Sequence, residues 1–190
     1  MTIKRSTNGS SGVNLWKGLA AGLIGGLVAS WTMNRFQDVW IKLAQSTQKP
    51  PRAHDPLSNL ERDERAEASS EPEDDTTVRT ASAISEGLFD HKLTQKEKKI
   101  AGPAVHYVLG TGVGGLYGAA AEIAPEVTTG TGLPFGAAFW LVVDEGAVPL
   151  LGLSKGPTAY PLSTHAYALS SHFVYGLTAE IVRRVIRRAL

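Results

Sequence analysis

Seven ionisable side chains lie in or beside long stretches of sequence that otherwise carry no charge. Ionisable groups are costly in apolar surroundings, so they are retained where they pair with one another or carry out a function. Carboxylates beside histidines can exchange protons near neutral pH, and the same ligands suit zinc or iron. The groups fall into two sets. The first is His106, Asp144, Glu145, His165 and His172; the second is Glu122 and Glu180, next to Arg183 and Arg184.

Helical spacing predicts that these two sets form layers at opposite ends of a helix bundle. Glu122 follows His106 by about 24 Å along a helix that rises 1.5 Å per residue. His165 and His172 share one helical face, and Gly176 and Glu180 continue that face away from His172. Gly146 and Pro149 directly follow the two carboxylates of the first set, where they should loosen or break the helix.

The polar residues allow three interpretations. In the first, they form hydrogen-bonded pairs that lock the helices together, with Glu180 bound to Arg183 or Arg184. In the second, the first set handles protons or ions. In the third, the histidines of that set bind zinc or iron together with Asp144 or Glu145, although no compact H-E-x-x-H spacing supports a metal site. No nucleophile–base pattern stands out, so we expect neither an enzyme nor a cofactor.

Four apolar runs predict the elements that position these groups. About 20 apolar residues cross a bilayer as a helix, and the runs cover residues 18–34, 100–121, 133–153 and 156–179. The predicted fold is therefore an all-α polytopic membrane protein with about four transmembrane helices. A long, polar, partly disordered loop joins the first helix to the second.

Charge is concentrated between the first two runs. Residues Arg35 to Lys99 hold 24 of the 37 charged residues, and such dense charge with little apolar surface favours disorder. The acidic stretch from Glu61 to Asp75 is a weaker candidate for recruiting a soluble partner. The expected divisions are a polar tail (1–14), a first transmembrane helix with an interfacial extension (15–47), a disordered linker (48–79), a short amphipathic surface segment (80–99) and a three-helix membrane domain with a basic tail (100–190).

Glycine recurs at every fourth position in the first two runs. The residues are Gly18, Gly22 and Gly26, then Gly110, Gly114 and Gly118. Small residues at this spacing let helix backbones approach closely, within one chain or between copies. The stretch from Gly110 to Gly115 also matches G-x-G-x-x-G, but without a preceding strand or a βαβ unit that pattern does not predict nucleotide binding.

The composition of the chain and the charges beside its apolar runs limit the partners and the compartment that can be expected. The net charge of +1 gives no reason to expect nucleic-acid binding, and a chain without cysteine forms no disulfide. Basic residues favour the cytoplasmic side of a membrane. They precede the first run at Lys4, Arg5 and Lys17 and follow the last run from Arg183, so both termini are expected in the cytoplasm.

Three segments resemble the YagU-like family of small bacterial inner-membrane proteins, a domain of unknown function. They are AGPAVHYVLGTGVGGLYGAAAEIAPEV (101–127), FGAAFWLVVDEGAVPLLGL (135–153) and SSHFVYGLTAEIVRRVIRR (170–188). The resemblance extends over roughly residues 14–34 and 100–190. It implies a multi-pass protein of the bacterial plasma membrane and supplies no catalytic residue.

The sequence thus predicts an integral membrane protein with an interaction or accessory role and a structural His/carboxylate cluster. The alternative is a small proton- or ion-handling or pH-responsive protein that uses Asp144, Glu145 and the histidines; a metal-binding role is the lesser alternative. The expected partners are the lipid bilayer and either further copies of the chain or other membrane proteins.

Overall fold

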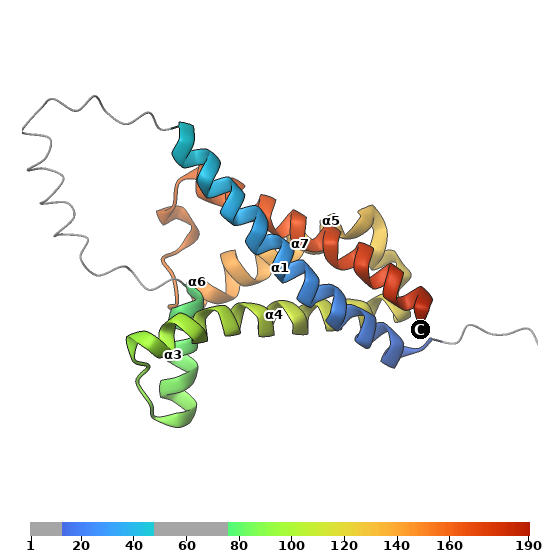
Figure 1. Ribbon diagram of the computed structural model, residues 1–190, viewed down its shortest axis with the longest axis horizontal. Helices are drawn as coiled ribbons and strands as arrows, with labels where there is room; N and C mark the ends of the chain where they lie inside the picture. Colours follow the sequence, from blue (N-terminus) through green and yellow to red (C-terminus); the bar gives the residue numbers. More distant parts are fainter. Residues whose placement is uncertain (1–12, 48–75) are drawn as a thin grey trace, which may run out of the picture.

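A computed structural model describes residues 13–47 and 76–190, and every regular element in these ranges is helical. The main helices are α1 (Leu15–Thr47), α3 (Thr76–Phe89), α4 (Gln95–Ile123), α5 (Leu133–Val142), α6 (Val148–Leu150) and α7 (Leu162–Ala189) (Figure 1). Shorter turns are η1 (Pro125–Gly132), η2 (Val143–Ala147) and η3 (Pro157–Ala159). Most of the expected tail and nearly all of the expected disordered linker lie outside the described residues.

The long helices alternate in direction (Figure 1). Helix α1 runs antiparallel to α4 and α7, and the α5–α6 segment runs antiparallel to α7. Lys17 in the first turn of α1 donates a hydrogen bond to the carbonyl of Leu190. The backbone N–H of Asn14 donates to the Glu122 carboxylate at 3.3 Å. The start of α1 and the end of α7 therefore meet at one end of the bundle, called here the terminal end. The opposite end, where α1 finishes and α3 begins, is called the α3 end.

The two glycine series meet in a single interface between α1 and α4. A Cβ atom added to Gly26 would lie 2.5 Å from the carbonyl oxygen of Gly110, and one on Gly18 would lie 2.5 Å from that of Gly118. A Cβ atom on Gly22 would collide with the Gly114 carbonyl. Only glycine allows the two backbones this approach, and in the structure it joins helices of the same chain.

A second close contact joins α5 to α7. A Cβ atom on Gly176 would lie 2.8 Å from the Gly136 amide nitrogen and would collide with the Gly132 carbonyl. Gly132 also has φ +81°, a left-handed conformation that suits glycine. Gly132 and Gly136 were not among the predicted packing residues, although their four-residue spacing repeats the pattern of the other two series.

Burial in this bundle is inverted relative to a water-soluble helical protein. The described residues include no buried Leu, Ile, Val, Phe or Trp. The buried face of α1 is instead made of small residues and one methionine: Gly18, Ala21, Gly22, Gly25, Gly26, Ala29, Ser30 and Met33. Its large apolar residues point outward, with Leu27 50% and Trp31 57% exposed. Such broad apolar exposure is what a helix bundle presents to lipid.

One helical run among the described residues, Pro125–Leu150, is long and apolar enough to cross a membrane. By this criterion α1, α4 and α7 do not qualify, whereas the sequence predicted four crossings. The physical reason is composition: the glycines, serines and histidines in those helices lower their mean hydropathy. Within Pro125–Leu150, residues Thr129, Gly130 and Thr131 have non-helical backbone angles, so the regular helix starts at Leu133.

The boundaries of three elements differ from the expected ones. Helix α7 begins at Leu162 rather than near residue 156, because Pro157 and Pro161 interrupt the helical pattern. Helix α4 begins at Gln95, before the apolar run, because Thr94 and Glu97 form a capping box. The Thr94 amide donates to the Glu97 carboxylate and holds the pKa of that carboxyl below its usual range. The amphipathic segment is helix α3, which starts before residue 80 and ends at Phe89.

Candidate functional site

The first polar set lines one cavity of about 610 Å³ at the α3 end of the bundle. Residues from α1, α3, α4, α5, the η2 turn, α6, the segment 151–161 and α7 form its walls. Much of the wall is apolar, including Met33, Leu109, Phe139 and Val143. The five ionisable residues predicted to form one layer all line it: His106, Asp144, Glu145, His165 and His172. An apolar cavity with a few convergent polar groups is typical of a binding site.

A π-helical turn positions both carboxylates of the cavity. Val143–Ala147 forms the turn, with Asp144 and Glu145 at its start. Pro149 lies two residues after the turn and carries no N–H to donate to the carbonyl of Glu145, so regular α-helical bonding is lost at this point. The predicted loosening of the helix here is confirmed. π-helical turns inside α-helices occur frequently at functional sites.

His165 connects the π-turn to the segment between α6 and α7. Its Nδ1 lies 2.6 Å from Glu145 Oε1, and its Nε2 lies 3.0 Å from the carbonyl oxygen of Pro157. Both neighbours are hydrogen-bond acceptors, so both ring nitrogens must carry protons for the two bonds to form. The geometry therefore favours the imidazolium form of His165, which neutralises Glu145.

This geometry makes a spectroscopic prediction. At neutral pH, ¹⁵N NMR of the histidine rings should show His165 protonated on both nitrogens. His172 provides an internal comparison, because its Nδ1 lies 2.9 Å from the Ala168 carbonyl and a single proton satisfies that bond. Glu145→Gln should return His165 to a neutral ring at the same pH. A neutral His165 in the unmodified protein would contradict the assignment.

The other three residues of the predicted set, His106, Asp144 and His172, come from three elements. His172 of α7 is 5% exposed, and its Nδ1 is 3.8 Å from Asp144 Oδ2 on the π-turn. Phe139 of α5 packs edge-on against the His172 ring, with centroids 5.2 Å apart. His106 of α4 lines the cavity and lies edge-on to Tyr107. The structure therefore brings all five residues to one cavity, with direct contacts in two His–carboxylate pairs.

The described residues include no group of three histidine, cysteine or acidic side chains placed to bind a metal ion. Within the set, His165 contacts Glu145 and His172 contacts Asp144. The zinc or iron alternative therefore has no geometric support in this part of the chain.

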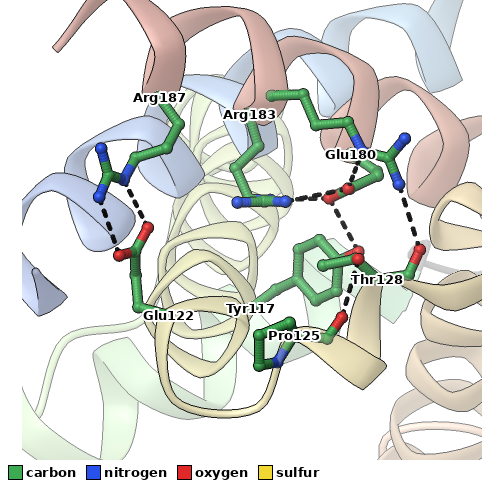
Figure 2. A network of polar contacts seen from close by, with 8 residues as sticks. Tyr117, Glu122, Pro125, Thr128, Glu180, Arg183 and Arg187 are labelled. Atoms are coloured by element: carbon green, nitrogen blue, oxygen red, sulfur yellow. Dashed lines mark hydrogen bonds and ion pairs between the residues drawn. The ribbon is translucent and has the colours of Figure 1, made fainter. Parts of the chain in front are cut away.

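The second polar set forms a buried ionic cluster towards the terminal end, shown in Figure 2. Glu180 of α7 is fully buried and accepts a hydrogen bond from the Tyr117 hydroxyl at 2.9 Å. Arg183 donates to both of its oxygens, at 2.7 and 2.9 Å, and Arg184 also donates to it. The predicted pairing of Glu180 with these arginines is present in the structure.

Glu122 has a separate partner at the same end of the bundle. Arg187 donates from Nη2 to Glu122 Oε2 at 3.0 Å and from Nε to the other oxygen (Figure 2). The sequence placed Glu122 in this layer with the arginines from Arg183 onward, but it predicted neither the pairing with Arg187 nor the contact of Tyr117. Tyr117 gives no local signal, since its partner is 63 residues away. The pairing with Arg187 had a signal in the sequence, because Arg187 lies on the Arg183 face one helical turn further on.

An aromatic layer separates the two polar layers. The rings of Tyr117 and Phe135 stack with centroids 3.9 Å apart, and the Tyr175 hydroxyl donates to the Gly110 carbonyl at 2.6 Å. Gly110 and Tyr175 line the cavity, whereas Tyr117 and Glu180 do not. In this structure the cavity therefore ends at the aromatic layer.

Fold and site together define an all-helical bundle with a candidate membrane-spanning run and a polar cavity at one end. A family model matches residues 39–181, and the chain belongs to that family, described as Protein of unknown function (DUF1440). The matched region covers the cavity-bearing helices α4 to α7 up to Ile181 and starts within α1. No curated protein and no solved structure matches the chain.

Proposed function

We infer that the chain is an integral membrane protein in which α1, α4, the α5–α6 segment and α7 each cross the bilayer. The burial pattern supports this topology, because the four segments bury mainly small or polar residues, with Met33, Tyr117 and Tyr175 as the larger exceptions, and expose many of their leucine, isoleucine and valine side chains. The alternating helix directions suit four crossings with both described ends on one side. The basic residues Lys17, Arg184 and Arg188 at the terminal end favour the cytoplasm for that side. The proposed location is the bacterial plasma membrane, with membership of a YagU-like group.

The activity that the geometry supports best is proton or ion handling at the cavity. The observation that carries this proposal is the convergence of two carboxylates and three histidines in one cavity beside a π-turn. A purely structural cluster would be expected to pack without such a space. Histidine–carboxylate pairs change charge near neutral pH, so cavity charge and ligand affinity should respond to pH. The protein is not proposed to be an enzyme, and no cofactor or nucleotide is proposed.

Replacing the cavity carboxylates should abolish a pH-driven response. In proteoliposomes enclosing a pH-sensitive dye, Asp144→Asn and Glu145→Gln should each lower acid-driven proton entry at least tenfold. The exposed Glu126→Gln should leave the rate unchanged, and gel filtration should show that all three variants remain folded. If the folded cavity variants conduct as well as the unmodified protein, or if that protein conducts no better than empty liposomes, the proton-handling proposal fails.

An accessory role is the second candidate. The aromatic and ionic layers support it, because they close this cavity towards the terminal end. Under this proposal the His–carboxylate pairs lock α7 to the π-turn, and the chain works beside further copies or other membrane proteins. Native mass spectrometry of gently extracted protein should then show a defined assembly, whereas a bare monomer would oppose this role.

A further inference from the structure

Helix α3 carries an apolar face that no other described element covers. Leu88 is 75% exposed, Phe89 74% and Ile84 45%. Nearer the start of the helix the same side packs on α4, where Ala81 is buried and Val78 lies against Gly102. The first half of α3 therefore docks on α4, and the large apolar side chains of its second half stay uncovered by the described elements. In water this arrangement would leave a row of apolar side chains without a partner.

The orientation of α3 suits a membrane surface. It lies across the first turns of α4 instead of alongside the long helices (Figure 1). If α4 crosses the bilayer, α3 lies close to the membrane plane at the α3 end. Amphipathic helices in this position bury their apolar face about 5–10 Å deep, at the boundary between headgroups and acyl chains.

Basic residues next to α3 indicate which kind of membrane surface the helix would bind. Lys92, Lys96 and Lys99 are exposed and lie between the apolar end of α3 and the apolar part of α4. The segment from Arg79 to Lys99 holds five basic and three acidic residues. One acidic residue, Glu97, is engaged with the Thr94 amide and with His91. Lysines at headgroup level attract anionic lipids.

We propose that α3 and the lysines that follow it form an in-plane docking surface for anionic phospholipid, with Leu88 and Phe89 inserted among the acyl chains. The first turns of α3 line the cavity, but Leu88, Phe89 and the lysines do not, so the proposed surface needs no activity in the cavity. It does depend on the proposed topology, because α3 lies in the membrane plane only if α4 crosses the bilayer.

The absence of native cysteine makes this proposal directly testable. Full-length Leu88→Cys, Phe89→Cys and Glu86→Cys variants, each spin-labelled, can be placed in nanodiscs of phosphatidylcholine with one third phosphatidylglycerol. Labels at 88 and 89 should be reached by oxygen and shielded from a water-soluble nickel complex, and the Glu86 label should show the reverse. Nickel access at both 88 and 89, or spin–spin coupling between copies there, would overturn the proposal. A label at Leu116 on α4 reports the crossing separately, so failure of the topology and failure of the docking surface are distinguishable.

Lipid selectivity provides the second readout. Replacing Lys92, Lys96 and Lys99 together by glutamine should lower the preference for phosphatidylglycerol over phosphatidylcholine about tenfold or more, measured by native mass spectrometry of bound lipid. Replacing Arg35, Lys42 and Lys155 by glutamine removes the same charge elsewhere and should have a much smaller effect. Equal effects of the two triple variants would contradict a local site, and the spin labels test lipid contact even if one variant fails to fold.

Discussion

Replacing Glu180 by glutamine is expected to destabilise the protein more than any other single change of charge. The fully buried carboxylate accepts hydrogen bonds from Arg183, Arg184 and Tyr117. Its loss leaves the buried Arg183 without a counter-charge, which typically costs about 3–5 kcal/mol. The free energy of unfolding in mixed micelles, followed by circular dichroism, should fall by an amount in this range.

Two variants make the Glu180 result specific. Glu126→Gln removes an exposed carboxylate at the same end of the bundle and should change stability by less than about 0.5 kcal/mol. The double variant Glu180→Gln, Arg183→Met removes both buried charges and should recover much of the loss. If Glu180→Gln is as stable as Glu126→Gln, the ionic cluster does not hold the helices together.

The second large effect is expected in the glycine interface between α1 and α4. A side chain at Gly114 would place its Cβ 2.5 Å from the Cα of Gly26 and 2.7 Å from the Gly22 carbonyl. Backbone atoms cannot move aside as a flexible side chain can. The loss of stability caused by Gly114→Leu should therefore exceed the value of about 1–3 kcal/mol that is typical of an overpacked core. The substitution should also force the two helices apart. Thermal stability and the distance between spin labels on α1 and α4 would measure both consequences.

Gly112 supplies the matched control on the same helix. A Cβ atom added there meets nothing within 4 Å. Because glycine is a poor helix former, Gly112→Leu should be neutral or slightly stabilising. Equal destabilisation by the two variants would show that helix composition, and not the α1–α4 contact, governs stability.

Local patterns in the sequence predicted much of the helical framework. The loosening at Gly146 and Pro149 followed from missing backbone hydrogen bonds and coincides with a π-turn. The start of α7 was placed too early, because apolar composition continues through the proline-containing segment that precedes it. The number of membrane crossings stays a proposal, since glycine-rich helices score low in hydropathy although their outward faces are apolar.

Depth along a helix was the useful signal for the site. The distance along each helix separated the residues near His106 and His165 from those near Glu122 and Glu180. In the structure the first group lines the cavity and the second forms the ionic cluster. Individual partners were harder to predict. His165 binds Glu145 and the Pro157 carbonyl, while Tyr117 binds Glu180, and such pairings depend on helix rotation and on turn geometry that periodicity does not determine.

The most direct test of the account is a cysteine accessibility map of the four proposed crossings. Single cysteines would replace Leu23, Leu116, Leu141 and Leu177, which are outward-facing apolar residues on α1, α4, α5 and α7. Control cysteines would replace Thr158 at the α3 end and Glu126 at the terminal end. With a membrane-impermeant maleimide, the four helix positions should react only after detergent is added, Thr158 should react in intact cells, and Glu126 only in inverted vesicles. Reaction of any of the four helix positions from the aqueous phase would contradict a four-crossing bundle whose apolar surface faces lipid.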